Sequence, residues 1–229
     1  MSYLRYVRVI GTMHVSPRSR EDVVRTILKE RPNAIAVELD RARFLAMEGE
    51  RKATLGDAIR LGKGGLINYA LAKLEERLGE EFGMRPGGDM RAAVEVARRF
   101  GIPLFLIDEN IDVIIGKIAA APGREKLLMA LESLAVFLPV KPGDEMPDPL
   151  EEYRFMMAAF RRRYPYLYRV LVEERNEIMA RNLISIVDSL RAAGVRKPRV
   201  VAIVGLGHKQ GIEHLLDRWK TGTGRYVYI

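Results

Sequence analysis

The stretch that decides the fold runs from residue 7 to residue 40 and reads VRVIGTMHVSPRSREDVVRTILKERPNAIAVELD. Its first residues, 7–10, are mostly β-branched and predict a strand. Serine, proline and acidic residues at 16–22 are typical of a helix start, and apolar residues at helical spacing follow to about Arg31. A second apolar run at 34–39 completes strand, helix and strand within the length of a βαβ unit, which has parallel strands.

Two further apolar runs extend this pattern. Residues 103–107 follow a predicted helix over 90–100, and residues 200–204 precede a helix expected from about Gln210. Between them, residues 111–195 are almost wholly helical in pattern, apart from a proline-rich interruption, with a long helix expected over 166–193. The sequence therefore predicts a single α/β domain, residues 1–229, with a mostly parallel sheet flanked by helices. Residues 111–195 form a large helical insertion between the third and fourth predicted strands.

The composition excludes several classes of protein, among them membrane-spanning and disulfide-stabilised ones. The chain has 229 residues, 48% of them hydrophobic, which is enough to bury a sizeable core. Cysteine is absent, so disulfides, thiolate metal sites and a cysteine nucleophile are excluded. No apolar run reaches the ~20 residues of a membrane span, and no signal peptide is recognisable, so we expect a cytoplasmic protein. Many charged residues without cysteine are also typical of a thermophile.

Histidine marks the predicted strand ends. The chain has three histidines, and two close the matching stretches GTMH (11–14) and GLGH (205–208), each after a predicted strand. The carboxyl ends of parallel strands meet at one edge of a sheet, so His14 and His208 face one site if their strands are close neighbours. Glu38, at the end of the second predicted strand, adds a carboxylate. Two imidazoles and a carboxylate are a usual ligand set for Zn, Mn, Co or Fe(II), and such an ion can activate water for hydrolysis.

Other roles remain open for two of the acidic residues. A buried carboxylate is costly unless it is paired or bound to metal. Glu38 is therefore either part of the site, exposed at the strand end, or paired with Arg41 or Arg43. Asp108, which follows the third predicted strand, either joins the site or caps the next helix.

Weaker candidates lie on predicted helices. Arg175 could neutralise an oxyanion, although its spacing favours a salt bridge with Glu174 or Glu177. Asp89 is a natural N-cap for the helix that follows it. His214 falls at helical spacing and is expected on a helix surface.

Two other classes of function compete with a metal-dependent hydrolase. The same edge could bind a peptide, a metal or haem without turning anything over. The net charge of +8 could mark a nucleic-acid binder, but basic and acidic residues alternate along the helical segments, so this alternative is remote. Neither a phosphate-binding GK[ST] loop nor a Gly-x-Ser-x-Gly elbow is present.

Taken together, the motifs resemble those of the TraB/PrgY family. This family is related to the Tiki proteins and, more distantly, to the erythromycin-esterase and ChaN-like fold group. The resemblance rests on five stretches in family order: GTMHVS (11–16), AVELDRARF (36–44), RPGGDMRAAVEVARRFGIPLFLID (85–108), EERNEIMARNL (173–183) and VGLGHKQGI (204–212).

The resemblance implies a site and an activity. It places His14, Glu38 and His208 on the family's active-site positions, and Arg175 on another recurrent position. Tiki relatives are described as metal-dependent proteases, and PrgY-type relatives are linked to the shutdown of peptide pheromones by cleavage or by sequestration. We therefore expect a peptidase-like hydrolase with Mn, Co or Zn as cofactor and a peptide or another small amide or ester as substrate. The alternative is a non-catalytic binding protein.

The chain departs from the family pattern in three places. Many members carry Asp-Arg where this chain has Asp108-Glu109, and Glu where it has Asp89. Many archaeal members also continue into membrane helices, which this sequence does not contain, so no membrane role is expected. The helical insertion could be a lid or the interface of a homodimer.

Overall fold

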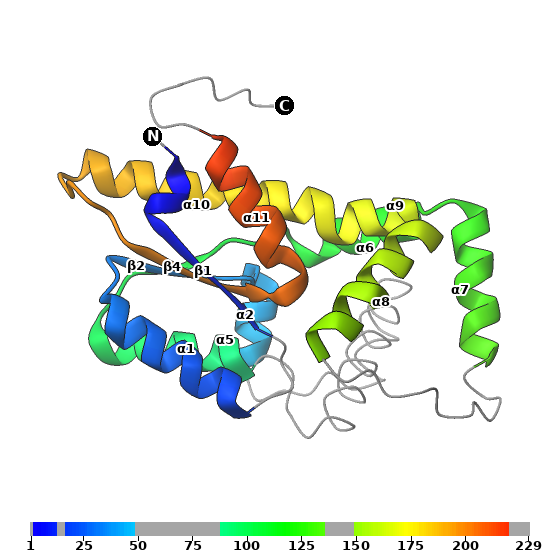
Figure 1. The fold of residues 1–229 in the computed structure, drawn as a ribbon, viewed down its shortest axis with the longest axis horizontal. Coiled ribbons are helices and arrows are strands. Elements are labelled where there is room, and N and C mark those ends of the chain that lie inside the picture. The colour runs from blue at the N-terminus through cyan, green and yellow to red at the C-terminus, as the bar shows by residue number, and fades with distance from the viewer. Residues whose placement is uncertain (1, 13–16, 49–87, 136–148, 220–229) are drawn as a thin grey trace.

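The computed structural model describes residues 2–12, 17–48, 88–135 and 149–219. Its centre is a four-stranded sheet in which every pairing is parallel and the strand order is β1-β4-β2-β3 (Figure 1). The strands are β1 (Val7–Thr12), β2 (Ala34–Val37), β3 (Leu104–Leu106) and β4 (Val200–Gly205). The predicted α/β fold is confirmed.

Helices cover both faces of the sheet. Helices α1 (Pro17–Glu30) and α5 (Gly88–Phe100) lie on one face, and α10 (Arg175–Ala192) and α11 (Leu206–Arg218) lie on the other (Figure 1). Because both faces are covered, β2 and β4 carry apolar residues without interruption and are buried along most of their length.

Alternate strand residues face two separate cores. On the α1 side, Ile35 and Ile203 pack with Ile27. On the α10 side, the sheet presents smaller residues such as Ala36 and Ala202 to the larger side chains of α10 and α11. Together the two cores fix the sheet between its helical layers, and so fix the strand ends at which the site is built.

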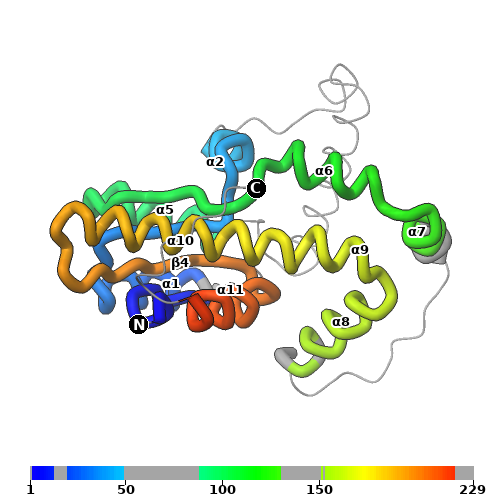
Figure 2. Tube along the Cα trace, turned by 90° about the horizontal axis from the view of Figure 1, so that it is seen from above, coloured from blue at the N-terminus to red at the C-terminus, as the bar shows by residue number. Residues whose placement is uncertain are grey.

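The helices of the predicted insertion lie beyond the end of the sheet at which the strands terminate (Figures 1 and 2). They are α6 (Ile111–Ala119), α7 (Gly123–Ala135), α8 (Pro149–Arg163), α9 (Pro165–Tyr168) and the π-helical turn η2 (Arg169–Glu174). Their exposed large apolar side chains include Leu127 and Phe155. A lid or a homodimer interface, the two roles left open for the insertion, both stay predictions.

The long helix expected over 166–193 is present, but it is not uniform. It consists of α9, the π-helical turn η2 and α10, joined without a break. A π-turn inserts an extra residue and widens the helix, and such turns are frequent at functional sites. Here the widened turn ends immediately before Arg175.

Two local expectations are corrected, and one of the two roles left open for Asp108 is excluded. The helix after β4 begins at Leu206 rather than near Gln210, so His208 lies in its first turn and not in a loop. The side chain of Asn110, not that of Asp108, accepts the capping hydrogen bond of α6. Asp89 lies inside the first turn of α5 rather than at its N-cap, because the helix already begins at Gly88.

Two short helical segments complete the described chain. The 3-10 turn η1 (Tyr3–Arg5) precedes β1, and α2 (Arg41–Glu48) follows β2. Within the four described ranges we find no helix with the length and apolar character that crossing a bilayer requires.

Candidate functional site

Strand pairing brings the two GxxH stretches to one edge of the sheet. β1 and β4 are neighbours in register, with Thr12 opposite Gly205, so both stretches begin at the same edge of the sheet. β2 lies on the other side of β4, and the Glu38 amide donates to the Ile203 carbonyl at 3.0 Å. The strands that precede the two histidines are therefore direct neighbours in the sheet. His14 itself lies outside the described residues.

Glu38 is held at the start of α11. Its Oε2 accepts a hydrogen bond of 2.6 Å from the backbone N–H of Gly205, the residue that precedes the helix. Its Oε1 forms an ion pair with Arg175 and lies 3.3 Å from His208 Nε2. Only 8% of the surface of Glu38 is exposed. The N-terminus of a helix favours a negative charge at this position. Of the roles left open for Glu38, a pair with Arg41 or Arg43 is not observed, because its partner is Arg175.

Arg175 contacts each of the other charged or titratable groups at the strand ends: Glu38, Asp108 and His208. Its Nε and Nη2 contact the two oxygens of Asp108 at 3.0 and 2.5 Å, which is a bidentate ion pair. Nη2 also contacts Glu38, and Nη1 donates to the Leu171 carbonyl at 3.1 Å in the π-helical turn. Burial alone would lower the pKa of Arg175, but hydrogen bonds and charge interactions with Asp108 and Glu38 raise it above its ordinary value. The guanidinium is therefore permanently charged.

The salt bridges expected for Arg175 from its helical neighbours are not formed. Glu174 pairs instead with Lys117 and Arg169, and Glu177 pairs with Arg181. Arg175 points away from these neighbours toward the strand ends, where it meets carboxylates from two different strands.

Asp108 joins the site through its arginine partners. Burial would raise its pKa, but Arg175 and Arg43 together hold the pKa of Asp108 below its usual value. Arg43, on α2, forms an ion pair with Asp108 and also donates to the Glu109 carbonyl at 3.3 Å. A second guanidinium thus reaches Asp108 from α2, although the chain has Glu109 where many family members carry arginine.

His208 is oriented by Asn176. Its Nδ1 lies 2.8 Å from Asn176 Oδ1, and its Nε2 lies 3.2 Å from Arg175 Nη1. Since a guanidinium can only donate, we assign the proton to Nδ1, where it is donated to Asn176, and the lone pair to Nε2. Burial, which is the largest effect, lowers the pKa of His208 despite the nearby Glu38 carboxylate. The imidazole is therefore neutral at pH 7 and directs its lone pair at the Glu38–Arg175 pair.

Two glycines of α11 make room for the site. A Cβ on Gly211 would overlap the Asn176 side-chain amide, and a Cβ on Gly207 would lie 2.5 Å from the Tyr153 hydroxyl. The glycines of the stretch VGLGHKQG thus permit close packing around His208 and do not form a phosphate loop.

Tyr153 reaches the site from α8. Its hydroxyl lies close to Gly207 in the first turn of α11, whose backbone acts to lower the pKa of the phenol. Burial is the largest cause that raises the pKa of Tyr153, and the negative charge of Glu38 adds to it, so the phenol stays protonated. A helix of the predicted insertion therefore contributes a hydroxyl beside Glu38.

Three of these groups were not predicted from the sequence. Asn176 is adjacent to Arg175, and the glycine at 211, one turn after His208, is the one signal that could have indicated a close neighbour there. Tyr153 and Arg43 carried no such signal. By contrast, His214 lies exposed on α11, as expected of a helix-surface residue.

The described residues do not form a complete set of metal ligands. No group of three histidine, aspartate or glutamate side chains suited to a metal ion occurs in residues 2–12, 17–48, 88–135 and 149–219. Two donors are well placed: the 3.3 Å between Glu38 Oε1 and His208 Nε2 matches the ~3.4 Å between two ligands of a tetrahedral ion. A third donor would have to come from His14. A cation at this position would also displace Arg175 from Glu38, because the guanidinium contacts both donor atoms.

Sequence comparisons relate the chain to a known protein family. A sequence model of the TraB/PrgY/gumN family matches residues 4–222. A protein of Methanocaldococcus jannaschii described as uncharacterized is 30% identical, and the alignment covers 96% of this chain and 58% of that protein. TraB domain-containing proteins of Mus musculus and Homo sapiens are 31% and 30% identical, over 94% of this chain and 63% of each. The chain thus spans about three-fifths of the length of these relatives.

Proposed function

The chain belongs to the TraB/PrgY/gumN family, and from this premise we propose that it is a divalent-metal-dependent hydrolase that cleaves a peptide or another amide or ester. The observation that carries the proposal is the pair formed by Glu38 Oε1 and His208 Nε2, 3.3 Å apart at the carboxyl ends of parallel strands. His14, which follows the strand next to that of His208, is the proposed third ligand.

The orientation of His208 supports a ligand role. A histidine that binds metal usually donates its other ring N–H to a fixed acceptor, which sets the tautomer. Asn176 Oδ1 is such an acceptor, at 2.8 Å from Nδ1. The lowered pKa of His208 keeps the imidazole neutral, and a neutral imidazole is the form that binds metal.

Each residue then has a defined task. His14 and His208 bind the ion, and Glu38 binds it or acts as the general base. A bound divalent ion would polarise the scissile carbonyl and lower the pKa of a water molecule. Asp108 keeps Arg175 in place through its bidentate pair after Glu38 is released, so the guanidinium is available to stabilise negative charge that develops on the substrate.

A non-catalytic binding protein is the second candidate. It is favoured because the polar groups of the site already pair with one another without a metal. Arg175 contacts Glu38, Asp108 and His208, and Glu38 lies 3.3 Å from His208. Such a self-paired cluster can bind a peptide by exchanging one ion pair for another, with no chemical step. Binding of the substrate peptide without its cleavage would favour this candidate.

The proposal is tested by assaying the protein on quenched-fluorescent peptides and ester substrates in Mn²⁺, Co²⁺ or Zn²⁺. We expect hydrolysis that a chelator abolishes and that Glu38→Gln reduces by at least ~100-fold, the contribution of a general base. His214→Ala, a change on the exposed face of α11, should leave the rate unchanged. Metal-independent turnover, or full activity of Glu38→Gln, would contradict the proposal.

A further inference from the structure

In the described part of the chain, no strand pairs with the outer edge of β1. There, β1 pairs with β4, at one end of the strand order β1-β4-β2-β3. The Val200 amide donates to the Tyr6 carbonyl at 2.8 Å, so the backbone groups of Tyr6 face β4. Because these groups alternate in direction along a strand, those of Val7, Val9 and Gly11 face away from β4. They form an edge that can accept another strand.

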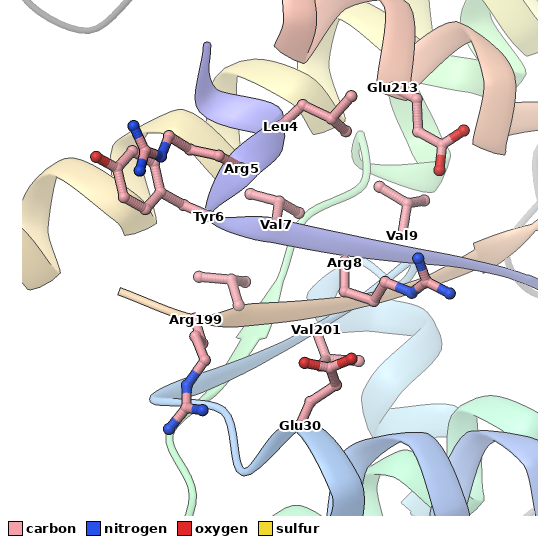
Figure 3. Close-up of a pocket in the computed structure, with 11 residues that line it drawn as sticks. Leu4, Arg5, Tyr6, Val7, Arg8, Val9, Glu30, Arg199, Val201 and Glu213 are labelled. Atoms are coloured by element: carbon pink, nitrogen blue, oxygen red, sulfur yellow. The ribbon is translucent and has the colours of Figure 1, made fainter. Parts of the chain in front are cut away.

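A groove runs along this edge. Its volume is ≈ 340 Å³, and it is lined by residues 4–9, by Glu30 of α1 and Glu213 of α11, and by residues 199–201 at the start of β4. Figure 3 shows β1 crossing the groove, with Glu213 on one side of the strand and Glu30 on the other. Both acidic residues therefore flank the space that a strand added to β1 would occupy.

The handedness of the connections between strands indicates where a further strand of this chain would lie. The connections from β1 to β2 and from β2 to β3 both cross the sheet in the same direction. They contain α1 and α5, which lie on one face. From β3 to β4 it returns with α10 on the opposite face, which gives the same hand. Connections between parallel strands are right-handed in ~98% of cases. Helix α11 follows β4 and packs beside α10, so a parallel strand after α11 has to lie on the β1 side of β4.

The position next to β4 is already taken by β1. A strand that follows α11 would therefore pair with the outer edge of β1. Helix α11 ends at Arg218 near the start of β1, where the Ser2 hydroxyl donates to the Leu216 carbonyl at 3.2 Å. A strand that starts from this end would run parallel to β1, as the crossover requires.

The sequence after α11 suits this role. Residues 219–224 have the length of a usual connection between a helix and a strand. Residues 225–229, RYVYI, are rich in the β-branched and aromatic residues that favour strands. Tyrosines at 226 and 228 would share one face, and Val227 and Ile229 the other. Arg225 would enter a groove flanked by Glu30 and Glu213.

We propose that residues 225–229 add to the outer edge of β1 as a fifth parallel strand and fill the groove seen in Figure 3. β1 then becomes an internal strand, paired on both sides. The docked segment would also hold the strand that precedes His14 in the sequence. This inference does not depend on the proposed hydrolase activity.

Residue-resolved hydrogen exchange of the full chain tests the proposal. We expect alternate amides within 226–229, together with those of Val7, Val9 and Gly11, to exchange on the order of 100-fold more slowly than in an unfolded peptide. Proline cannot donate to a ladder. Because the register decides which tail amides face β1, either Val227→Pro or Tyr228→Pro should abolish this protection, whereas Thr223→Pro, in the connection, should not.

The dependence on protein concentration identifies the occupant. Protection that is independent of concentration supports docking of the chain's own segment. Protection that appears only as the protein dimerises would show that a second copy supplies the strand, and would overturn the proposal. Exchange of residues 226–229 at the rate of an unfolded peptide, or protection that survives both proline variants, would also overturn it.

Discussion

Arg175 and Asp108 form a bidentate ion pair, with Nε 3.0 Å from Oδ1 and Nη2 2.5 Å from Oδ2, that joins the first turn of α10 to the chain just after β3. The same guanidinium contacts Glu38 at the end of β2 and faces His208 at the start of α11. One side chain therefore connects every strand-end group of the described site. Asp108 binds Arg175 through both of its carboxylate oxygens, whereas Glu38 binds it through Oε1 alone.

Loss of Arg175 should be strongly destabilising. Arg175→Ala leaves the buried carboxylates of Glu38 and Asp108 without their shared cation, and breaking a buried pair in this way typically costs about 3–5 kcal/mol. Arg181→Ala removes an exposed pair with Glu177 and should cost less than about 0.5 kcal/mol. Urea unfolding of both variants measures the difference. Equal effects would mean that Arg175 does not hold the strand ends together.

Two glycine substitutions should act in opposite directions. Gly211→Ala forces the new methyl group against Asn176, so we expect a loss of about 1–3 kcal/mol from overpacking. Gly116→Ala on α6 meets no atom within 4 Å and should stabilise the helix by about 0.5–1 kcal/mol. Thermal or urea unfolding of both variants checks the signs. A neutral Gly211→Ala would contradict the close packing of Asn176.

The lowered pKa of His208 predicts a specific pH dependence in the metal-free protein. Its folded-state pKa lies below 6.5, mainly because of burial, so the unfolded state binds the proton more readily. The stability that follows from this shift is fully present above pH 6.5 and is lost as the pH falls through the folded-state pKa. His208→Gln should flatten that part of the stability profile, measured by urea unfolding between pH 7.5 and 5. A profile as steep as the wild type's would contradict the assignment.

The tautomer of His208 can be observed directly. Nitrogen NMR at pH 7 should show a neutral ring with the proton on Nδ1, since Asn176 accepts from Nδ1 and Arg175 donates to Nε2. In Asn176→Ala the acceptor is lost, so the proton should redistribute between the two ring nitrogens. A wild-type ring protonated on Nε2 would contradict the proposed direction of its lone pair.

Much of the sheet could be predicted from the sequence because its signals are local. Residues 200–204 are a continuous apolar run followed by glycine, and the structure has β4 at Val200–Gly205. Glu38 was recognised because a carboxylate at the end of such a run requires a partner. The identity of that partner could not be predicted, since Arg175 is 137 residues away and lies on another element.

The errors have a common physical cause. The expected partners of Arg175 were its neighbours on the same helix, whereas the fold directs its side chain toward carboxylates that follow β2 and β3. The late start expected for α11 reflected the two glycines at 205 and 207, which disfavour a helix locally. In the structure, the helix begins at Leu206, where the Gly205 N–H binds Glu38 and Gly207 packs against Tyr153. Tertiary contacts thus override the local preference.

The central claim is most directly tested by measuring the metal content of the untagged protein after equilibration with Mn²⁺, Co²⁺ and Zn²⁺. The wild type should retain about one ion per chain, the His14→Ala/His208→Ala double variant none, and the His214→Ala control as much as the wild type. Each variant should first be shown to be folded by circular dichroism. A wild type that binds no metal, or a double variant that binds as much as the wild type, would contradict the account.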